Sequence, residues 1–101
     1  MLITSGEGAE TQVGTAGDDE YRGNGGSDNF DAGAGNDLLD AGTGDDTVAG
    51  GTGNDTIAAG TGNDSVDAGT GNDSVDAGTG NDNVLAGEGD DTVLALSLIH
   101  I

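Results

Sequence analysis

Large apolar residues recur along most of this chain at intervals of nine, and small or polar residues fill the positions between them. Written in rows of nine, the sequence from Gly14 to Leu94 gives nine rows, numbered one to nine, with no insertion or deletion. The eighth position of each row is large and apolar: Tyr21, Phe30, Leu39, Val48, Ile57, Val66, Val75, Val84 and Val93. A fixed period of this kind predicts a repeat architecture whose units bury their apolar side chains by stacking on one another.

Glycine and aspartate hold other fixed positions in the same rows. The fourth position is always Gly and the sixth is always Asp, while the second is Gly except in rows one and two, where it is Thr15 and Asn24. Glycine permits positive φ angles, and β-branched residues favour extended backbone. Each row is therefore predicted to comprise a six-residue loop and a three-residue strand. Such a short strand directs only its central side chain inward, so the eighth position is the only predicted core.

The two ends of the chain depart from this pattern. Residues 1–13 form a predicted N-terminal edge with one degenerate repeat over residues 5–13, in which Gly6, Gly8 and Glu10 keep the phase but Gln12 holds the core position. Residues 95–101 form a non-repeat tail. Its last six residues are those encoded by CTG TCT CTT ATA CAC ATC, which resembles a sequencing adapter. We expect these six residues to be an adapter-derived artefact on a fragment of a longer protein.

Composition restricts the partners of such a chain. Only 32% of the 101 residues are apolar, and the net charge is −19 with Arg22 as the one Lys or Arg. An acidic chain is repelled by nucleic acid and by anionic membrane surfaces, so neither is an expected partner, and cations are. No apolar run approaches the length of a membrane span, so no membrane insertion is expected. Low hydrophobicity with high charge is also typical of disorder, but the strict repeat argues against that interpretation.

These rows resemble the hemolysin-type RTX (repeats-in-toxin) family, whose calcium-binding nonapeptide is Gly-Gly-x-Gly-x-Asp-x-U-x, with U a large apolar residue. The resemblance covers residues 14–94. It implies an all-β fold, a right-handed parallel β-roll (a β-solenoid) in which two nine-residue repeats make one 18-residue turn. It also implies a monomeric module of a longer, secreted bacterial protein that is exported by type I secretion and folds outside the cell on binding calcium.

The ninth position of each row offers an independent check on the 18-residue turn. It holds Arg22, Asp31, Asp40, Ala49, Ala58, Asp67, Asp76, Leu85 and Leu94. Stacking at nine residues would place Asp31 on Asp40 about 4.8 Å apart, where they repel, whereas stacking at 18 residues places Arg22 on Asp40 and separates the acids. The two-row turn is favoured.

The resemblance also implies the ligands of the metal. Ca²⁺ takes six to eight hard oxygens from carboxylates and backbone carbonyls, whereas Mg²⁺ demands octahedral geometry and keeps its waters. The implied carboxylate ligands are Asp37, Asp46, Asp55, Asp64, Asp73, Asp82 and Asp91, with Asp19 and Asp28 less secure because of Thr15 and Asn24. The implied carbonyl ligands are Gly33, Gly35, Gly42, Gly44, Gly51, Gly53, Gly60, Gly62, Gly69, Gly71, Gly78, Gly80, Gly87 and Gly89. Asp residues 18 apart form at most seven pairs, so we expect up to about seven Ca²⁺ ions.

Two alternative functions stay open. Rows four to eight carry Thr in the third position, and the form Gly-Thr-Gly-Asn-Asp resembles the calcium-dependent ice-binding repeats of a bacterial adhesin. Stacking at 18 residues would divide these Thr residues into ranks of three and two, which counts against an ice-binding or adhesive surface. Alternatively, the chain is a non-catalytic C-terminal part of an RTX toxin, protease or lipase. No nucleophile with a base is found, so no enzyme is expected within these residues.

Overall fold

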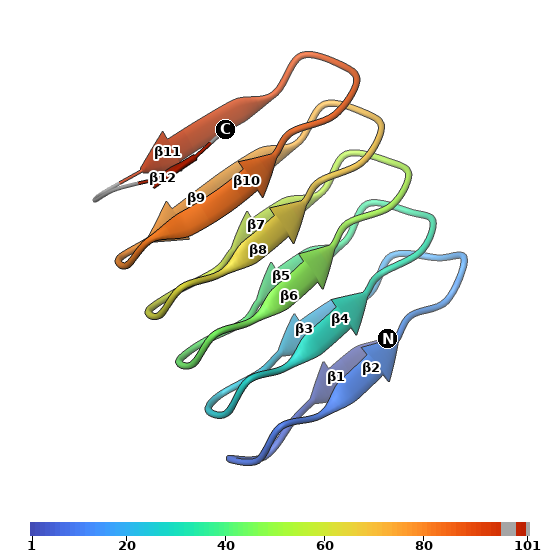
Figure 1. Cartoon of the computed structure of the whole chain (residues 1–101). Helices are drawn as coiled ribbons and strands as arrows, with labels where there is room; N and C mark the ends of the chain where they lie inside the picture. The colour runs from blue at the N-terminus through green and yellow to red at the C-terminus, as the bar shows by residue number, and fades with distance from the viewer. Residues whose placement is uncertain (96–98, 101) are drawn as a thin grey trace.

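The computed structural model, which describes residues 1–95, 99 and 100, is a stack of flattened turns made of short strands (Figure 1). The described strands are β1 (Leu2–Thr4), β2 (Thr11–Val13), β3 (Glu20–Arg22), β4 (Asn29–Asp31), β5 (Leu38–Asp40), β6 (Thr47–Ala49), β7 (Thr56–Ala58), β8 (Ser65–Asp67), β9 (Ser74–Gly78), β10 (Asp82–Leu85), β11 (Thr92–Ala95) and β12 (Ile99–His100). Within the described residues there is no helix that could cross a membrane.

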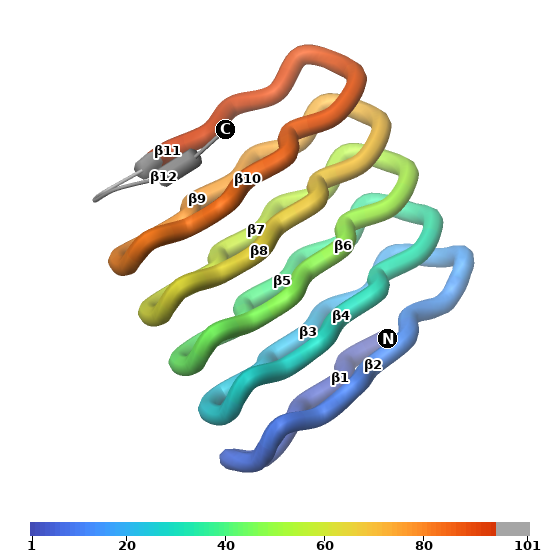
Figure 2. Tube along the Cα trace, viewed as in Figure 1, coloured from blue at the N-terminus to red at the C-terminus, as the bar shows by residue number. Residues whose placement is uncertain are grey.

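Successive strands alternate between two parallel sheets. The sheet orders are β1-β3-β5-β7-β9-β11 and β12-β10-β8-β6-β4-β2. Phe30 lies opposite Val48 in one sheet and Leu39 opposite Ile57 in the other, each pair 18 residues apart. Figure 2 follows the chain through these turns, two rows to each. The predicted β-solenoid with an 18-residue period is confirmed.

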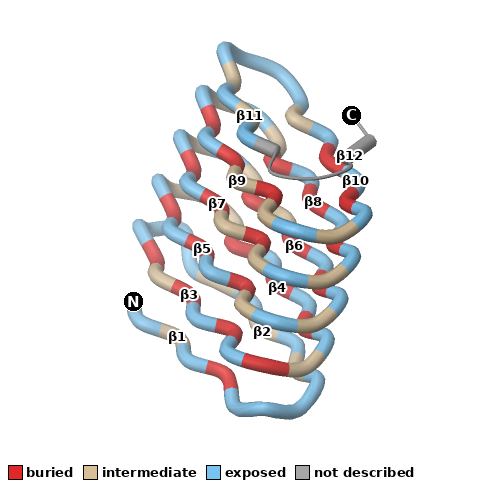
Figure 3. The backbone as a smooth tube through the Cα atoms, turned by 90° about the vertical axis from the view of Figure 1, so that its left-hand side faces the viewer, coloured by how far each residue is buried: buried red, intermediate tan, exposed pale blue. Residues whose placement is uncertain are grey.

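The core is a thin layer between the two sheets. The molecule measures 27 × 26 × 13 Å, and the eighth-position side chains from Tyr21 to Val84 are buried in it. The rings of Tyr21 and Phe30 pack edge to face with centroids 5.4 Å apart. Figure 3 shows the buried segments recurring at matching places in successive turns.

The prediction that only the eighth position faces the core was wrong. First-position alanines are also fully buried: Ala32, Ala41, Ala59, Ala68 and Ala77. The backbone stays extended past both ends of each strand, so its side chains continue to alternate between the two faces. The side chains of the sixth position, the eighth position and the first position of the next row therefore all face inward. The N–H of Ala41, for example, donates to the carbonyl of Ala58, which extends the sheet by one residue.

The stack extends on the N-terminal side of row one. Strand β2 pairs with β4, and β1 pairs with β3 in the same register as the later strands. Ile3 packs against the core, and Gln12, half-buried, lies opposite Phe30 at a core position. Residues 2–13 thus form a strand and one further row.

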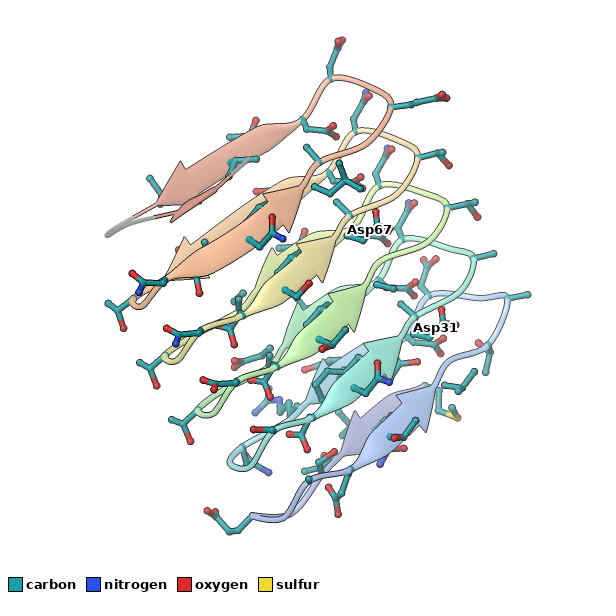
Figure 4. The ribbon with its side chains drawn as sticks, viewed as in Figure 1. Asp31 and Asp67 are labelled. Carbon is teal, nitrogen blue, oxygen red and sulfur yellow. The ribbon has the colours of Figure 1, made fainter. Side chains whose placement is uncertain are left out.

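The outer faces of the sheets carry the ninth-position charges. Arg22 lies opposite Asp40 in the sheet, although its guanidinium is paired with Glu20 at 3.1 Å. Asp31 on β4 and Asp67 on β8 flank β6, whose Ala49 lies opposite both (Figure 4). The predicted separation of acids across neighbouring turns is confirmed.

The C-terminal tail is described only in part. The backbone of β12 pairs with β10, with Ile99 opposite Asp82. Residues 96–98 and 101 lie outside the described residues. The adapter origin of the last six residues stays a prediction.

Candidate metal centre

Glycine allows neighbouring loops to touch backbone to backbone. From Gly33 on, the second and fourth positions of every row have positive φ, as at Gly51 (98°) and Gly53 (117°). A Cβ built on Gly53 would lie 1.9 Å from the carbonyl oxygen of Gly35 in the turn below, where no side chain fits. Any residue larger than Gly would force two turns apart.

Backbone hydrogen bonds join the loops that touch in this way. The N–H of Thr52 donates to the carbonyl of Gly33 at 2.9 Å, and the N–H of Gly35 donates to the carbonyl of Thr52 at 3.0 Å. Each second-position carbonyl of this kind therefore uses one of its lone pairs to accept a hydrogen bond from the neighbouring turn. Fourth-position carbonyls such as those of Gly35, Gly44 and Gly53 accept no backbone hydrogen bond within the described residues.

The sixth-position carboxylates lie between the same loops. The N–H of Asp37 donates to Oδ1 of Asp55 at 2.8 Å, and this bond repeats up the stack at 18-residue spacing. It joins each of the predicted pairs: Asp19 with Asp37, Asp28 with Asp46, Asp37 with Asp55, Asp46 with Asp64, Asp55 with Asp73, Asp64 with Asp82, and Asp73 with Asp91. The structure therefore brings together every pair of aspartates that the sequence predicts.

The second oxygen of these carboxylates has no partner. Among the described residues, Oδ2 is buried without a hydrogen bond in Asp28, Asp37, Asp46, Asp55, Asp64, Asp73 and Asp82. A buried carboxylate oxygen without a partner is costly unless a cation or a proton satisfies it. These oxygens fit a hard cation held between the turns.

Burial raises the pKa of these aspartates. Burial is the main cause of a rise in the pKa of Asp55 to about 6, which the hydrogen bond from Asp37 opposes and the charges of Asp37 and Asp73 reinforce. Burial raises the pKa of Asp64 to about 6 as well, with the charges of Asp46, Asp82 and Asp45 adding to it. The pKa values of Asp37, Asp46 and Asp73 are raised by burial in the same direction. The ladder holds negative charge that the protein itself does not neutralise.

Row one is an exception to this pattern. Oδ2 of Asp19 accepts hydrogen bonds from the Thr15 N–H at 2.7 Å and the Thr15 hydroxyl at 3.0 Å, and its Oδ1 lies 3.2 Å from the Met1 ammonium. The N–H of Thr15 is the main cause that lowers the pKa of Asp19. Gly17 is absent from the positions with positive φ. The carboxylate of row one is thus already satisfied, mainly by Thr15 of the same loop.

Row two, by contrast, follows the later rows. Asn24 takes the positive φ of a second-position glycine, 66°, and its side-chain amide donates to the carbonyl of Ser5 at 2.6 Å. Oδ2 of Asp28 stays unpartnered, as in the later rows. Asn tolerates this backbone conformation far better than Thr, which is β-branched. The two rows that the sequence leaves doubtful therefore differ from each other.

A second side-chain ladder, which the sequence analysis missed, runs through the fifth position. The N–H of Asn54 donates to Oδ1 of Asn36 at 2.8 Å, and the N–H of Asn72 donates to Oδ1 of Asn54 at 2.9 Å. The signal in the sequence was that this position is always Asp, Asn or Ser. These residues satisfy the loop N–H groups that no backbone carbonyl reaches.

Ligands for a metal held between these loops would have to come from two kinds of group. No three His, Cys, Asp or Glu side chains converge on one point in the described part of the chain. A site between two turns can therefore combine a pair of aspartates with backbone carbonyls, but it cannot be an all-carboxylate cage. Mixed carboxylate and carbonyl coordination is typical of Ca²⁺.

The third-position threonines lie on the loops in short ranks. Thr43, Thr61 and Thr79 form one rank, and Thr52 and Thr70 form the other, which Ala34 and Glu88 extend at its two ends. The ranks of three and two match the division expected from 18-residue stacking. The structure thus adds no long regular face that would favour ice binding.

Comparison with known proteins agrees with this geometry. The family model of the RTX calcium-binding nonapeptide repeat, which describes four copies, matches residues 4–39, 13–48, 22–57, 40–75 and 58–93. Neither a curated protein nor a solved structure matches the chain. The matches to the family model together span residues 4–93, and the chain belongs to the RTX calcium-binding nonapeptide repeat family.

Proposed function

We propose that the chain is a structural module that folds on binding Ca²⁺ and that holds the ions between its stacked loops. The observation that carries this proposal is the row of buried aspartate Oδ2 atoms that have no partner within the described residues. Each ion would be bound by the carboxylates of two aspartates 18 residues apart and by glycine carbonyls of the same loops. Mg²⁺ is disfavoured because an extended row of carbonyls and carboxylates does not impose an octahedral shell.

We propose six sites rather than the upper limit of seven. The aspartates of these sites are Asp28 with Asp46, Asp37 with Asp55, Asp46 with Asp64, Asp55 with Asp73, Asp64 with Asp82, and Asp73 with Asp91. The Asp19 pair is left out because Thr15 already satisfies that carboxylate through its N–H and its hydroxyl. Six divalent ions would reduce the net charge from −19 to −7.

Metal binding then supplies most of the free energy of folding. The core is a single layer of side chains, and the metal-free ladder buries carboxylates that repel one another. A ligand that binds only the folded state stabilises that state by its binding free energy. The family membership supports a secreted bacterial protein. We infer that the module stays unfolded at low cytosolic calcium during type I export and folds at roughly millimolar calcium outside the cell.

Titration of the purified chain tests the proposal. In chelator, circular dichroism should show an unfolded chain, and Ca²⁺ should induce β-structure with about six ions bound by calorimetry. Mg²⁺ at the same concentration serves as the control and should leave the chain unfolded. A chain that is equally folded in chelator and in Ca²⁺ would refute the proposed function.

A further inference from the structure

The fifth- and sixth-position side chains point in opposite directions along the stack. A fifth-position side chain accepts from the row two places later, as Oδ1 of Asp45 does from the N–H of Asn63 at 2.8 Å. A sixth-position carboxylate accepts from the row two places earlier, as Oδ1 of Asp64 does from the N–H of Asp46 at 2.8 Å. Each gap between stacked loops therefore receives the fifth-position side chain of its lower row and the sixth-position carboxylate of its upper row.

Most of these gaps receive a neutral fifth-position side chain. In order along the chain, the lower-row residues of the seven gaps are Asp18, Ser27, Asn36, Asp45, Asn54, Asn63 and Asn72. Asp18 belongs to row one, where Asp19 is already satisfied by Thr15. Asp45 is thus the one fifth-position carboxylate that enters a gap between two aspartates with unpartnered Oδ2 atoms.

The gap in question lies between row four (residues 41–49) and row six (residues 59–67). Its aspartates, Asp46 and Asp64, are 1% and 2% exposed, and Oδ2 of each has no partner in the described chain. Asp45 is exposed and its Oδ1 is committed to Asn63, and no three acidic side chains converge on one point among the described residues. Asp45 would therefore act on a bound ion by its charge and not as a ligand.

We propose, resting on the calcium binding proposed above, that Asp45 makes the Asp46–Asp64 gap the first calcium site to fill. An ion there has the carboxylates of Asp64 and Asp45 in its gap and Asp46 on the loop below it, whereas the fifth-position side chain of the lower row is neutral in the other five proposed gaps. A negative charge close to a bound cation attracts it even when it is not a ligand, and so raises the calcium affinity of the gap. Filling this gap clamps row four to row six in the middle of the array, and the remaining turns add to it as nearest neighbours in both directions.

The variant Asp45→Asn tests this inference without removing a hydrogen bond. The amide oxygen of Asn can accept from Asn63 as the fifth-position Asn does in four other rows. Calorimetry should show the tightest Ca²⁺ class weakened by roughly fivefold or more, because a charge a few ångströms from the ion contributes about that much even when water screens it. Hydrogen exchange at one equivalent of Ca²⁺ should show protection centred on residues 41–67 in the parent chain and spread evenly in the variant.

Two further variants serve as matched comparisons. Asp67→Asn removes the same charge from the exposed face of β8, outside the loops, and should leave the tightest class unchanged. Asn54→Asp places a third carboxylate in the gap between Asp55 and Asp73 and should create a second tight class. A single substitution would then have given a second gap the same extra negative charge that Asp45 gives to the first.

The outcomes separate the two proposals. Equal weakening by Asp45→Asn and Asp67→Asn would show that only total charge matters and would overturn the inference. Failure of Asn54→Asp to add a tight class would overturn it as well. In both cases calcium binding by the parent chain would stand, whereas a parent chain that binds no Ca²⁺ would refute the proposed function itself.

Discussion

Backbone crowding controls individual positions in the loops more strongly than side-chain packing does. Where a glycine of the second or fourth position has positive φ, the preceding turn lies against its Cα, so an added Cβ would have no space and would strain the backbone. Among the fourth-position glycines the exception is Gly17 in row one, which does not have positive φ. A Cβ added to Gly17 would meet only Thr15 Oγ1, at 3.8 Å. The structure thus requires the invariant fourth-position glycine in the later rows but not in row one.

This difference predicts opposite results for two glycine substitutions. Gly53→Ala should lower the stability of the calcium-loaded roll by more than about 2 kcal/mol, because a strained backbone conformation and a steric overlap act together. Gly17→Ala should change it by less than about 0.5 kcal/mol, as at an unrestricted surface position. Thermal unfolding in saturating Ca²⁺ measures both. Equal losses would contradict the loop geometry described for row one.

Thr15 provides a second residue-level prediction. Thr15→Gly removes the hydroxyl, one of the groups that satisfy Asp19, and permits the positive φ found at the later second positions. The row-one loop should then accept metal, and the number of bound Ca²⁺ ions should rise by one. Asn24→Gly is the control, since row two already has this geometry, and should leave the number unchanged. An unchanged number in Thr15→Gly would show that Thr15 is not what excludes metal from that gap.

The strands, in contrast, are stabilised by a single layer of side chains. Ile57 on β7 is 1% exposed, between the two sheets, whereas Leu38 on the neighbouring β5 is 46% exposed on the outer face. Each strand from β3 to β10 contributes one large side chain to the core, and first-position alanines fill the space beside it. No neighbouring layer can move in to fill a cavity in so thin a core.

Ile57→Ala should therefore destabilise the calcium-loaded roll by about 2–5 kcal/mol, the usual range for deleting a large buried side chain. Leu38→Ala, in the adjacent strand, should change stability by less than about 0.5 kcal/mol because its side chain is mostly in water. Chemical denaturation at saturating Ca²⁺ measures both effects. A small loss in Ile57→Ala would mean that the metal ladder, and not the core, carries nearly all of the stability.

The sequence predicts strands and loops well here because the period of nine is unbroken. The 18-residue turn and the aspartate pairs are implied by the resemblance to the RTX family, and the residues of the ninth position support that turn independently. Two features could not be predicted in this way. The burial of Ala32 and its equivalents depends on extended backbone continuing past the strand, and the Asn36–Asn54 ladder depends on which N–H groups the loops leave unpaired. Both follow from three-dimensional stacking, which a one-dimensional pattern does not specify.

Charge dominates the behaviour of the whole molecule. A net charge of −19 and a ladder of buried aspartates oppose folding until a cation or a proton neutralises them. Calcium binding and protonation are therefore alternative ways of stabilising the same roll. They compete for the same carboxylate oxygens.

Because of this competition, the stability of the folded roll should depend on pH in opposite directions with and without Ca²⁺. In the metal-free roll the pKa values of Asp55 and Asp64 are about 6, against an ordinary value of 3.8 in the unfolded chain. A pKa that is raised in the folded state adds stability that is fully present below pH 3.8 and is lost as the pH rises through about 6. In chelator, circular dichroism should therefore show more β-structure at pH 4.5 than at pH 7.5. In Ca²⁺ the order should reverse, because protons displace the ion from the same oxygens.

The double variant Asp55→Asn with Asp64→Asn separates the charge of these two residues from that of the rest of the chain. Its amides carry no charge at any pH, so in chelator it should form more β-structure at pH 7.5 than the parent chain and depend less on pH. It should also bind fewer Ca²⁺ ions, since each of these aspartates belongs to two proposed sites. A metal-free parent chain that loses β-structure between pH 7.5 and 4.5 would show that the buried ladder does not control folding.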